Sequence, residues 1–354
     1  MALRSTLPPT GETRPGRRSL VIACLAAAVF FAAPALAQPD SSGIDFITVG
    51  APGNVPYSGP DSNNLVTGRG GVDYEYRIGR TEVPTALWVE FYNAFYGRAP
   101  HLTLPARWGA YSTGNPESPF AVIPSGNAGM WPVSGVTWRT SAMLCNWLHN
   151  DKRTDLAAVQ DGAYDISTFG YSGPNGQVFT DQAAHHPGAR YWIPTLDEWI
   201  KAAYYDPNYE GSGTGGWWWR TPAGTNIPLI HGPPGSGQSN SDFSLPDGGE
   251  YRIPLGAYPG TASPWGMLDA AGATREFLES IRITGGVPER MVNGSHWTDA
   301  DVGRDEIFLV GDAFPSIPSL FYGVRIAATV PGPSGVLCLS LLMTCYLGHS
   351  NRRR

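Results

Sequence analysis

Cysteine is scarce in this chain of 354 residues. Only four are present, and three of them lie in the terminal segments, as Cys24, Cys338 and Cys345. Cys145 alone remains in the body of the chain between those segments. Because a disulfide needs two thiols, that body cannot form an intrachain disulfide, and it has no thiol pair to serve as a reaction centre.

Charged residues are also few, at 15% of the chain, and no cluster of Lys or Arg occurs in its body. The net charge is −6, with 24 basic and 30 acidic residues. Nucleic-acid binding needs clustered cations that neutralise phosphates, so we exclude a nucleic-acid partner. No repeat of fixed period is visible, which argues against solenoids and propellers. With 44 glycines, 32 prolines and 12 tryptophans, the composition favours irregular loops packed on aromatic residues.

Residues 1–37 have the pattern of a signal peptide. Arg14, Arg17 and Arg18 form a positive region, residues 19–31 are almost entirely apolar, and the small-residue sequence ALA precedes the expected cleavage. The apolar run is shorter than the ~20 residues of a spanning helix, so cleavage is favoured over a retained anchor. We therefore expect export to the periplasm, the cell surface or the extracellular space.

Residues 331–354 form an unusual C-terminal segment. A Pro-rich hinge comes first, then an apolar stretch at 336–347, and then three terminal arginines at 352–354. This order resembles the PEP-CTERM sorting tail of bacterial exported proteins, which implies contact with a sorting machinery at the inner membrane. Gly332 stands where that tail has a Glu, and the apolar stretch would span only ~18 Å of a ~30 Å hydrocarbon core. A frayed, apolar C-terminus is the alternative.

Three short helices are predicted in the body. The first covers residues 85–95, where apolar residues recur every four positions after a Pro that suits a helix entry. The second follows Thr137 as its N-cap and carries Cys145 on its apolar stripe. The third begins with a capping box at Thr195. Residues 208–249, rich in Gly, Ser, Pro and Asn, are predicted to form a long ordered loop, and loops of that length are usually functional.

Six segments, in this order, resemble the sulfatase-modifying factor family, whose best-known member is formylglycine-generating enzyme. They are residues 78–83 (IGRTEV), 132–138 (PVSGVTW) with 145–148 (CNWL), 193–199 (IPTLDEW), 254–272, 293–295 (NGS) and 323–325 (GVR). The resemblance implies a single α+β domain over residues 38–330, loop-rich, with a C-type-lectin-like fold, few short helices and little regular structure.

The activity of that family does not transfer to this sequence. The family enzyme uses two cysteines shortly after its Gly-Gly-Ser element, where they bind copper and activate oxygen. Here residues 293–301 read NGSHWTDAD, and no cysteine follows before residue 328. Soft thiolates are the ligands that hold Cu(I), so copper is not expected. Cys145, on an apolar helix stripe, is interpreted as an inert core thiol.

We therefore interpret the chain as an exported, non-catalytic binding or scaffold protein of this family, and expect a monomer. Two alternatives stay open. One is an oxidoreductase of the formylglycine-generating type, and the other is an enzyme of the superfamily that uses chemistry without cysteine.

The predicted binding groove consists of His296, Trp297, Arg325 and Trp217, and its ligand would be a glycan, a peptide or a protein. His296 and Trp297 follow the Gly-Ser element, where the family has its active site. Trp217 opens the run Trp-Trp-Trp-Arg at 217–220, whose flat rings and guanidinium suit stacking with sugars or peptides. The alternative for this run is that the rings anchor the loop to the core, because consecutive tryptophans are not expected to face one ligand. The other histidines are scattered, and the adjacent His185 and His186 would point to opposite sides of a strand.

The resemblance also implies calcium. Asn240, with the carbonyl of Ser241, and Asp247 stand where family members bind Ca²⁺, and oxygen ligands from a Gly-rich loop suit this ion. A solvated loop is the alternative. Glu276 belongs to a second family site, although Ala273 replaces the Asn expected there.

Overall fold

The computed structural model describes residues 41–331, apart from residues 62, 125, 213–215, 246–248 and 301–302. All of the described residues belong to one compact unit. The expected signal peptide and nearly all of the expected C-terminal tail lie outside them, and so does Asp247. In the described part of the chain, no helix is long and apolar enough to cross a membrane.

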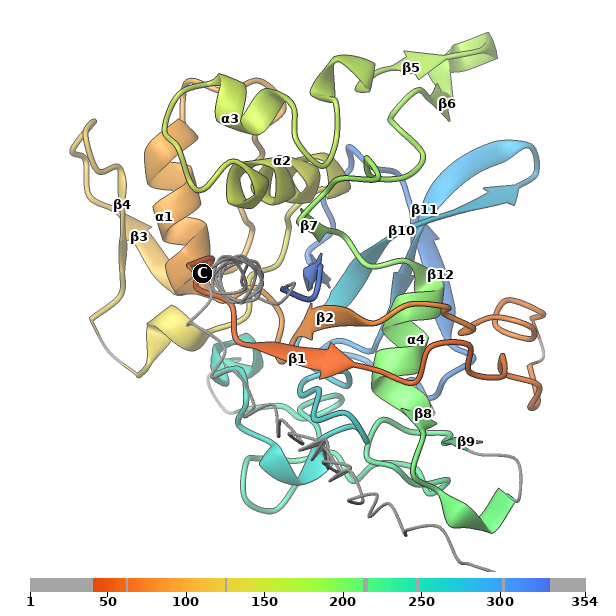
Figure 1. Ribbon diagram of the computed structural model, residues 1–354. Coiled ribbons are helices and arrows are strands. Elements are labelled where there is room, and N and C mark those ends of the chain that lie inside the picture. The colour runs from red at the N-terminus through yellow and green to blue at the C-terminus, as the bar shows by residue number, and fades with distance from the viewer. Residues whose placement is uncertain are drawn as a thin grey trace, which may run out of the picture. The chain divides into compact units, whose positions relative to one another are not determined.

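A four-stranded antiparallel sheet joins the beginning and the end of the described chain (Figure 1). Its order is β1 (Phe46–Val49), β2 (Tyr76–Gly79), β14 (Ala327–Ala328) and β7 (Tyr191–Trp192). Ile78 of β2 is paired with Ile47 on one side and with Ala327 on the other. All three residues are buried, so the sheet forms part of the core.

A second sheet of four strands has the order β12 (Val310–Ala313), β11 (Val287–Asn293), β10 (Arg275–Thr284) and β13 (Tyr322–Gly323). Strands β10 and β11 form a long hairpin that turns at Gly285 and Gly286, whose φ angles are 61° and 85°. A two-residue turn with two positive φ angles strongly favours glycine at both positions. Near its other end the hairpin carries Glu276, which is paired with Asn293.

The helices confirm the sequence prediction. Helix α1 spans Thr85–Phe95, α2 spans Trp138–His149 and α4 spans Leu196–Tyr204, while α3 (Ala157–Gln160) is a single additional turn. At the start of α2, the Thr137 side chain accepts the backbone N–H of Thr140. At the start of α4, Thr195 and Glu198 form both bonds of the capping box. Each cap thereby satisfies one free N–H group of its helix locally, while the N–H groups of Arg139 and Leu196 donate to the distant residues Pro315 and Ser280.

The remaining regular elements are short. Three two-stranded hairpins pair β3 with β4, β5 with β6 and β8 with β9 (Ala110–Ser112, Phe120–Val122, Tyr171–Ser172, Val178–Phe179, Tyr205–Asp206 and Trp217–Trp218). Single 3₁₀ turns occur at Ala128–Met130, Ile166–Thr168, Pro174–Gly176, Glu210–Ser212, Glu250–Arg252 and Pro259–Thr261. The loop predicted for residues 208–249 is therefore largely irregular, as expected, and β9 is the strand within its described residues.

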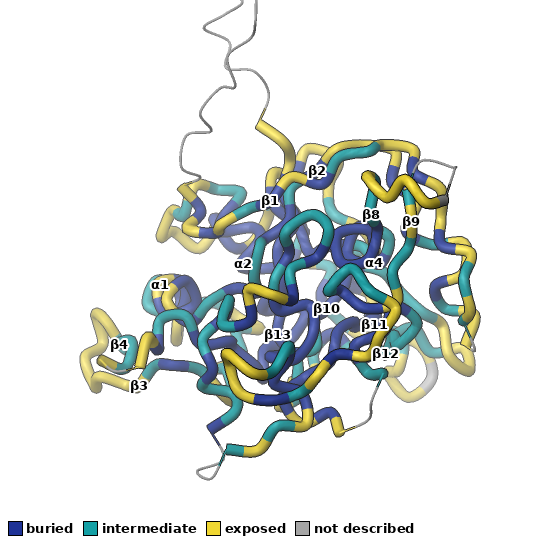
Figure 2. The backbone as a smooth tube through the Cα atoms, turned by 90° about the horizontal axis from the view of Figure 1, so that it is seen from below, coloured by how far each residue is buried: buried dark blue, intermediate teal, exposed yellow. Residues whose placement is uncertain are grey.

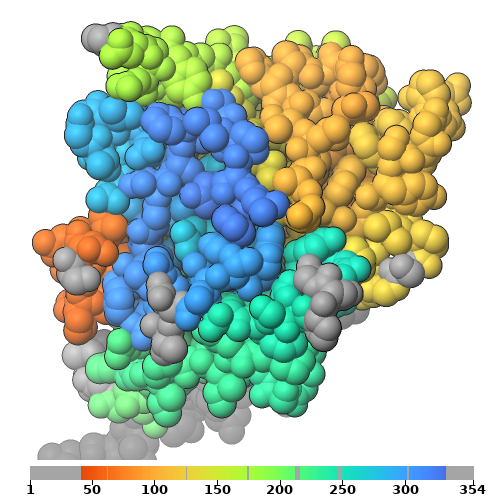
Figure 3. All heavy atoms as spheres, turned by 180° about the vertical axis from the view of Figure 1, so that it is seen from behind, coloured from red at the N-terminus to blue at the C-terminus, as the bar shows by residue number. Residues whose placement is uncertain are grey.

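The core lies around α2, α4 and β10, which are mostly buried in Figure 2 while the surrounding loops are exposed. Its largest fully buried side chains include four tryptophans, Trp88, Trp138, Trp147 and Trp199. From behind, Figure 3 shows the green segment of the long loop directly beside the blue closing segment. The backbone N–H of Ile307 donates to the carbonyl of Arg220 at 3.0 Å across that border. The long loop is thus attached to the end of the domain.

Candidate functional site

His296 occupies the segment that follows β11. Its ring stacks on Phe321, with centroids 4.2 Å apart and 13° between the planes. Nδ1 accepts the backbone N–H of Thr298 at 3.3 Å, which leaves Nε2 protonated and 3.3 Å from Oδ1 of Asp299. Burial lowers the pKa of His296 to about 4, so the imidazole is neutral at pH 7. Trp297 packs beside it on Phe321 and is also buried.

Arg325 lies in the interior. It is fully buried, pairs with Glu276 at 2.8 Å, and donates to the carbonyls of Gly79, Arg80 and Leu268. A guanidinium with all of these acceptors around it holds separate chain segments together. It cannot reach a ligand at the surface without breaking those bonds.

The structure therefore does not bring the four predicted groove residues together. His296 and Trp297 are neighbours at Phe321, whereas Arg325 connects chain segments in the interior. Trp217 belongs to β9 and is 40% exposed. Among the described residues, no hydrogen bond or ring contact links Trp217 to His296 or Arg325.

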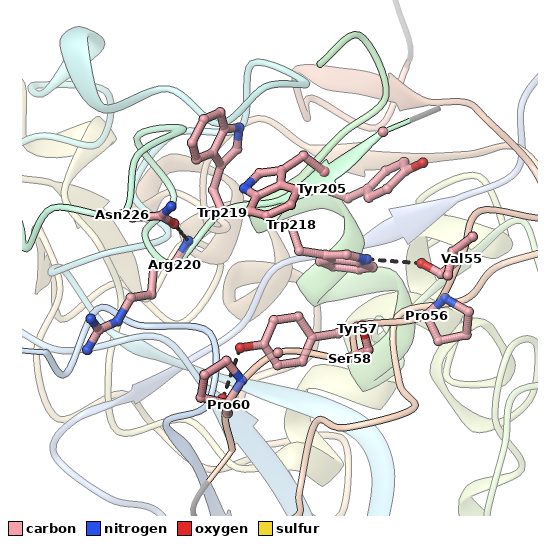
Figure 4. A pocket seen from close by; sticks show the side chains of 13 residues that line it. Val55, Pro56, Tyr57, Ser58, Pro60, Tyr205, Trp218, Trp219, Arg220 and Asn226 are labelled. Carbon is pink, nitrogen blue, oxygen red and sulfur yellow. Dashed lines mark hydrogen bonds between the residues drawn. The ribbon is translucent and has the colours of Figure 1, made fainter. Parts of the chain in front are cut away.

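Trp217 lines a different site, which we call the aromatic pocket (Figure 4). Its volume is about 490 Å³, within the range of small-molecule binding sites. Its walls are formed by residues 55–60, Tyr205, residues 216–220 and Asn226. Two stretches more than 150 positions apart in the sequence thus face the same space.

The β8–β9 hairpin positions the rings of the aromatic pocket. Tyr205 is paired with Trp218, and their ring centroids are 5.0 Å apart. The indole N–H of Trp218 donates to the carbonyl of Val55 at 3.0 Å, which attaches the 55–60 segment to the hairpin. Strand alternation places Trp217 and Trp219 together on the other side, with centroids 6.4 Å apart. Trp218 is therefore an anchor, and Trp217 is the exposed ring.

The three tryptophans divide as strand alternation predicts. All three border the pocket, but Trp218 lies on one side of β9 and Trp217 and Trp219 lie on the other. The pocket also contains Tyr57, which the sequence reading missed. In the sequence, Tyr57 stands alone in the Gly- and Pro-rich stretch 52–60. Nothing in that stretch indicates that it meets residues 216–220.

Arg220 closes one end of the aromatic pocket. It pairs with the buried carboxylate of Glu306 at 2.8 Å and lies over the ring of Phe308, 5.8 Å from its centroid. A smaller cavity of about 280 Å³ adjoins it, lined by Tyr57, Pro60, Arg220 and Phe308. The shared residues Tyr57, Pro60 and Arg220 make the two cavities neighbours.

A buried polar network attaches the long loop to the segment that contains Ser295 and Asp305. His231 Nε2 lies 2.9 Å from Oδ2 of Asp305, whose Oδ1 accepts the hydroxyl of Ser295. Ser241 Oγ lies 2.9 Å from Ser295 Oγ. Ser, His and Asp also form catalytic triads, but there the His lies between the other two. Here the carboxylate lies in the middle and Ser295 is fully buried, so no hydroxyl is prepared as a nucleophile.

The residues predicted to bind calcium have other partners. Asn240 Oδ1 accepts the N–H of Ala273 at 2.6 Å, and Ser241 belongs to the network with Ser295. Glu276 accepts from Trp199 and is paired with Arg325. Within the described residues, no group of three His, Cys, Asp or Glu side chains is placed to hold a metal ion. Asn240 and Ser241 do lie side by side, whereas Glu276 does not fit a cation site.

Cys145 lies as the sequence predicted, whereas His185 and His186 lie in a loop and not on a strand. Cys145 is fully buried in α2, and burial raises the pKa of its thiol well above the usual range. His185 contacts Glu279 at 2.9 Å, while His186 lies 3.6 Å from Asp161. The two imidazoles thus have separate partners and do not share a site.

The protein is a loop-rich α+β domain. Its pocket lies between the long loop and residues 55–60. The sequence matches the sulfatase-modifying factor enzyme 1-like domain over residues 53–330, which is well over half of the chain. The chain belongs to this family. The expected fold class is thereby confirmed.

Comparison with solved structures finds distant similarity. The chain is 19% identical to CarF, covering 82% of this chain and 100% of that one, with a TM-score of 0.49. It is 16% identical to Treponema denticola variable protein 1 (81% and 95% covered, TM-score 0.44). It is 14% identical to PvdO from Pseudomonas aeruginosa (81% and 92% covered, TM-score 0.42). No curated protein sequence matches the chain.

Proposed function

We propose that this chain is an exported, non-catalytic binding protein of the sulfatase-modifying factor family, and that its ligand occupies the aromatic pocket. The observation that carries the proposal is an open pocket of about 490 Å³ with an exposed tryptophan on its wall. Pockets of this size with aromatic walls and a few polar groups are typical binding sites. The signal-peptide pattern of residues 1–37 supports export.

The sequence after Ser295 supports the loss of the family reaction. No cysteine occurs between residues 296 and 328, and Cys145 is buried in α2. His296 stacks on Phe321 and has Thr298 and Asp299 as its polar neighbours, and a single imidazole does not replace the two thiolates that hold copper in the family enzyme.

An assay for formylglycine formation tests this loss. The full chain is incubated with a cysteine-containing sulfatase peptide and copper, and the peptide is analysed by mass spectrometry. A family enzyme that retains its two cysteines is the positive control. We expect no conversion by this chain. Conversion would contradict the proposal and favour the oxidoreductase alternative.

The ligand is proposed to be a glycan or a peptide, and calcium is proposed to assist. Asn240 and the Ser241 carbonyl would supply oxygen ligands together with Asp247, which lies outside the described residues. Glycan and peptide arrays probed with and without Ca²⁺ test both points. Binding that is lost in the Trp217→Ala variant supports the aromatic pocket as the site. Arrays without any signal would count against a binding function.

A further inference from the structure

The aromatic pocket presents ring faces rather than polar groups. The indole N–H of Trp218 donates to Val55, and that of Trp219 donates to Oδ2 of Asp206 at 3.2 Å. The hydroxyl of Tyr57 donates to the carbonyl of Pro60 at 2.9 Å. These donors are therefore already used within the protein. A ligand with many hydroxyl groups would lose hydrogen bonds to water on entering, because unpaired buried polar groups are unfavourable.

The aromatic rings that line the pocket meet one another at steep angles, and Tyr57, Trp218 and Tyr205 border the same space (Figure 4). Trp218 and Tyr57 are 77° apart in plane, and Trp217 and Trp219 are 70° apart. Tyr205 adds a further ring to the wall. Several aromatic faces around one space form the arrangement that binds a quaternary ammonium group through cation–π attraction.

The charges around the rings favour a cation. Asp206 accepts the indole N–H of Trp219, which makes the face of that ring more negative. Burial raises the pKa of Tyr57, the negative charge of Asp61 raises it further, and the charge of Arg220 lowers it, so charges of both signs act on this part of the pocket wall. Arg220 is the cation in the wall, but it is paired with Glu306 at 2.8 Å. Its guanidinium points away from the rings of Trp218 and Tyr205 in Figure 4.

We propose that the aromatic pocket binds a quaternary ammonium group of the choline type. The inference rests on the proposed binding function of the pocket, but in place of a glycan or a peptide it assigns a group that a small molecule or a lipid headgroup can carry. Arg220, at the end of the pocket, lies where it can meet an anionic group attached to the ammonium, such as a phosphate.

Titration calorimetry on the full chain tests the proposal with two matched probes. Choline carries the positive charge, whereas 3,3-dimethyl-1-butanol has the same shape without it. We expect choline to bind at least about tenfold more tightly, since desolvated cation–π contacts are worth that much. Equal affinities would overturn the inference but leave the binding function standing. Absence of binding by both probes would overturn it too, and the arrays would then decide the function separately.

Variants of the exposed ring locate the site. Trp217→Ala is expected to weaken choline binding about tenfold, while Trp217→Phe retains a ring and most of the affinity. Tyr111→Ala is the control, because Tyr111 is 49% exposed and lies outside the pocket. Thermal unfolding of each variant checks that it is folded. Unchanged binding by folded Trp217→Ala would contradict the assignment.

Two further arms identify the source of the group. Free phosphocholine is titrated in one, and vesicles of phosphatidylcholine are co-sedimented with the chain in the other. Tighter binding of phosphocholine than of choline, lost in Arg220→Gln, supports a soluble ligand. Co-sedimentation that Trp217→Ala abolishes supports a lipid headgroup. If neither phosphocholine nor the vesicles bind the wild-type chain or its variants, the proposal is overturned.

Discussion

Arg325 shows how one residue can decide the stability of this domain. Its guanidinium is fully buried and pairs with Glu276, and a second buried carboxyl, Glu82, lies close by. Burial raises the pKa of Glu82 well above its usual range, and the charge of Glu276 raises it further. The surroundings of Glu82 therefore favour its neutral form, and Glu276 is the carboxylate that pairs directly with Arg325.

Substitution of the two carboxyl groups by amides should have unequal effects. Glu276→Gln leaves the Arg325 charge buried without its counter-ion and is expected to reduce the free energy of unfolding by about 3–5 kcal/mol. Glu82→Gln leaves the pair of Arg325 and Glu276 in place and should reduce it by about 1 kcal/mol or less. Urea unfolding at pH 7, followed by circular dichroism, measures both. Similar losses would mean that Glu82 is ionised in the folded protein.

Two histidines should shift the stability in opposite directions with pH. Burial lowers the pKa of His296 to about 4, whereas in the unfolded chain it has the ordinary value of about 6.5. Between pH 6.5 and 4 the imidazole is therefore protonated in the unfolded chain and neutral in the folded one. Stability from this group is present above pH 6.5 and lost as the pH falls. Burial also tends to lower the pKa of His185, but its hydrogen bond and charge interaction with Glu279 outweigh burial and raise it. That contribution is present at acid pH and lost as the pH rises.

Unfolding at pH 7 and pH 5 tests both signs. His296→Phe keeps a ring on Phe321 and should reduce the loss of stability on acidification by about 1 kcal/mol, after allowance for solvent screening. His185→Gln should make the same loss larger. If both variants change the loss of stability in the same direction, the opposite pKa shifts assigned to the two histidines are contradicted.

At the scale of elements, local signals predicted what local interactions determine. Helix α1 has the predicted bounds, and Thr137 and Thr195 cap α2 and α4, because cap and periodicity lie within a few residues of each other. Cys145 was predicted on the apolar stripe of α2 and is buried there for the same reason.

Elements that depend on distant partners could not be predicted. Strand β14 has two residues, too few to show an alternating pattern, and exists through pairing with the remote strands β2 and β7. The aromatic pocket is of this kind, since Val55 and Trp218 meet only in the folded chain. Arg325 is the last residue of the family's closing motif and was assigned to a groove, but nothing in that motif indicates that its side chain points inward.

At the scale of the whole molecule, the first sheet depends on the last described residues. Strand β14 lies between β2 and β7, and the carbonyl of Ile326 accepts the N–H of Gly79 at 2.9 Å. Without residues 326–328, β2 and β7 would lose their common partner, and buried backbone groups would be left unpaired.

Truncation should therefore have an abrupt effect. A chain that ends at Pro331 retains β14 and is expected to unfold cooperatively, whereas one that ends at Arg325 is expected to show no cooperative thermal transition. Circular dichroism during heating, on chains that both start at Gln38, measures the difference. Cooperative unfolding of the shorter chain would show that β14 is dispensable.

The position of β14 also bears on when this chain can fold during its synthesis. The strand that completes the first sheet is almost the last part of the domain to leave the ribosome, so the native sheet cannot close while the chain is still growing. Pairing across such long sequence separations is slow as well, because a large loop must be closed first. The domain therefore cannot complete its native fold until the residues of β14 have emerged.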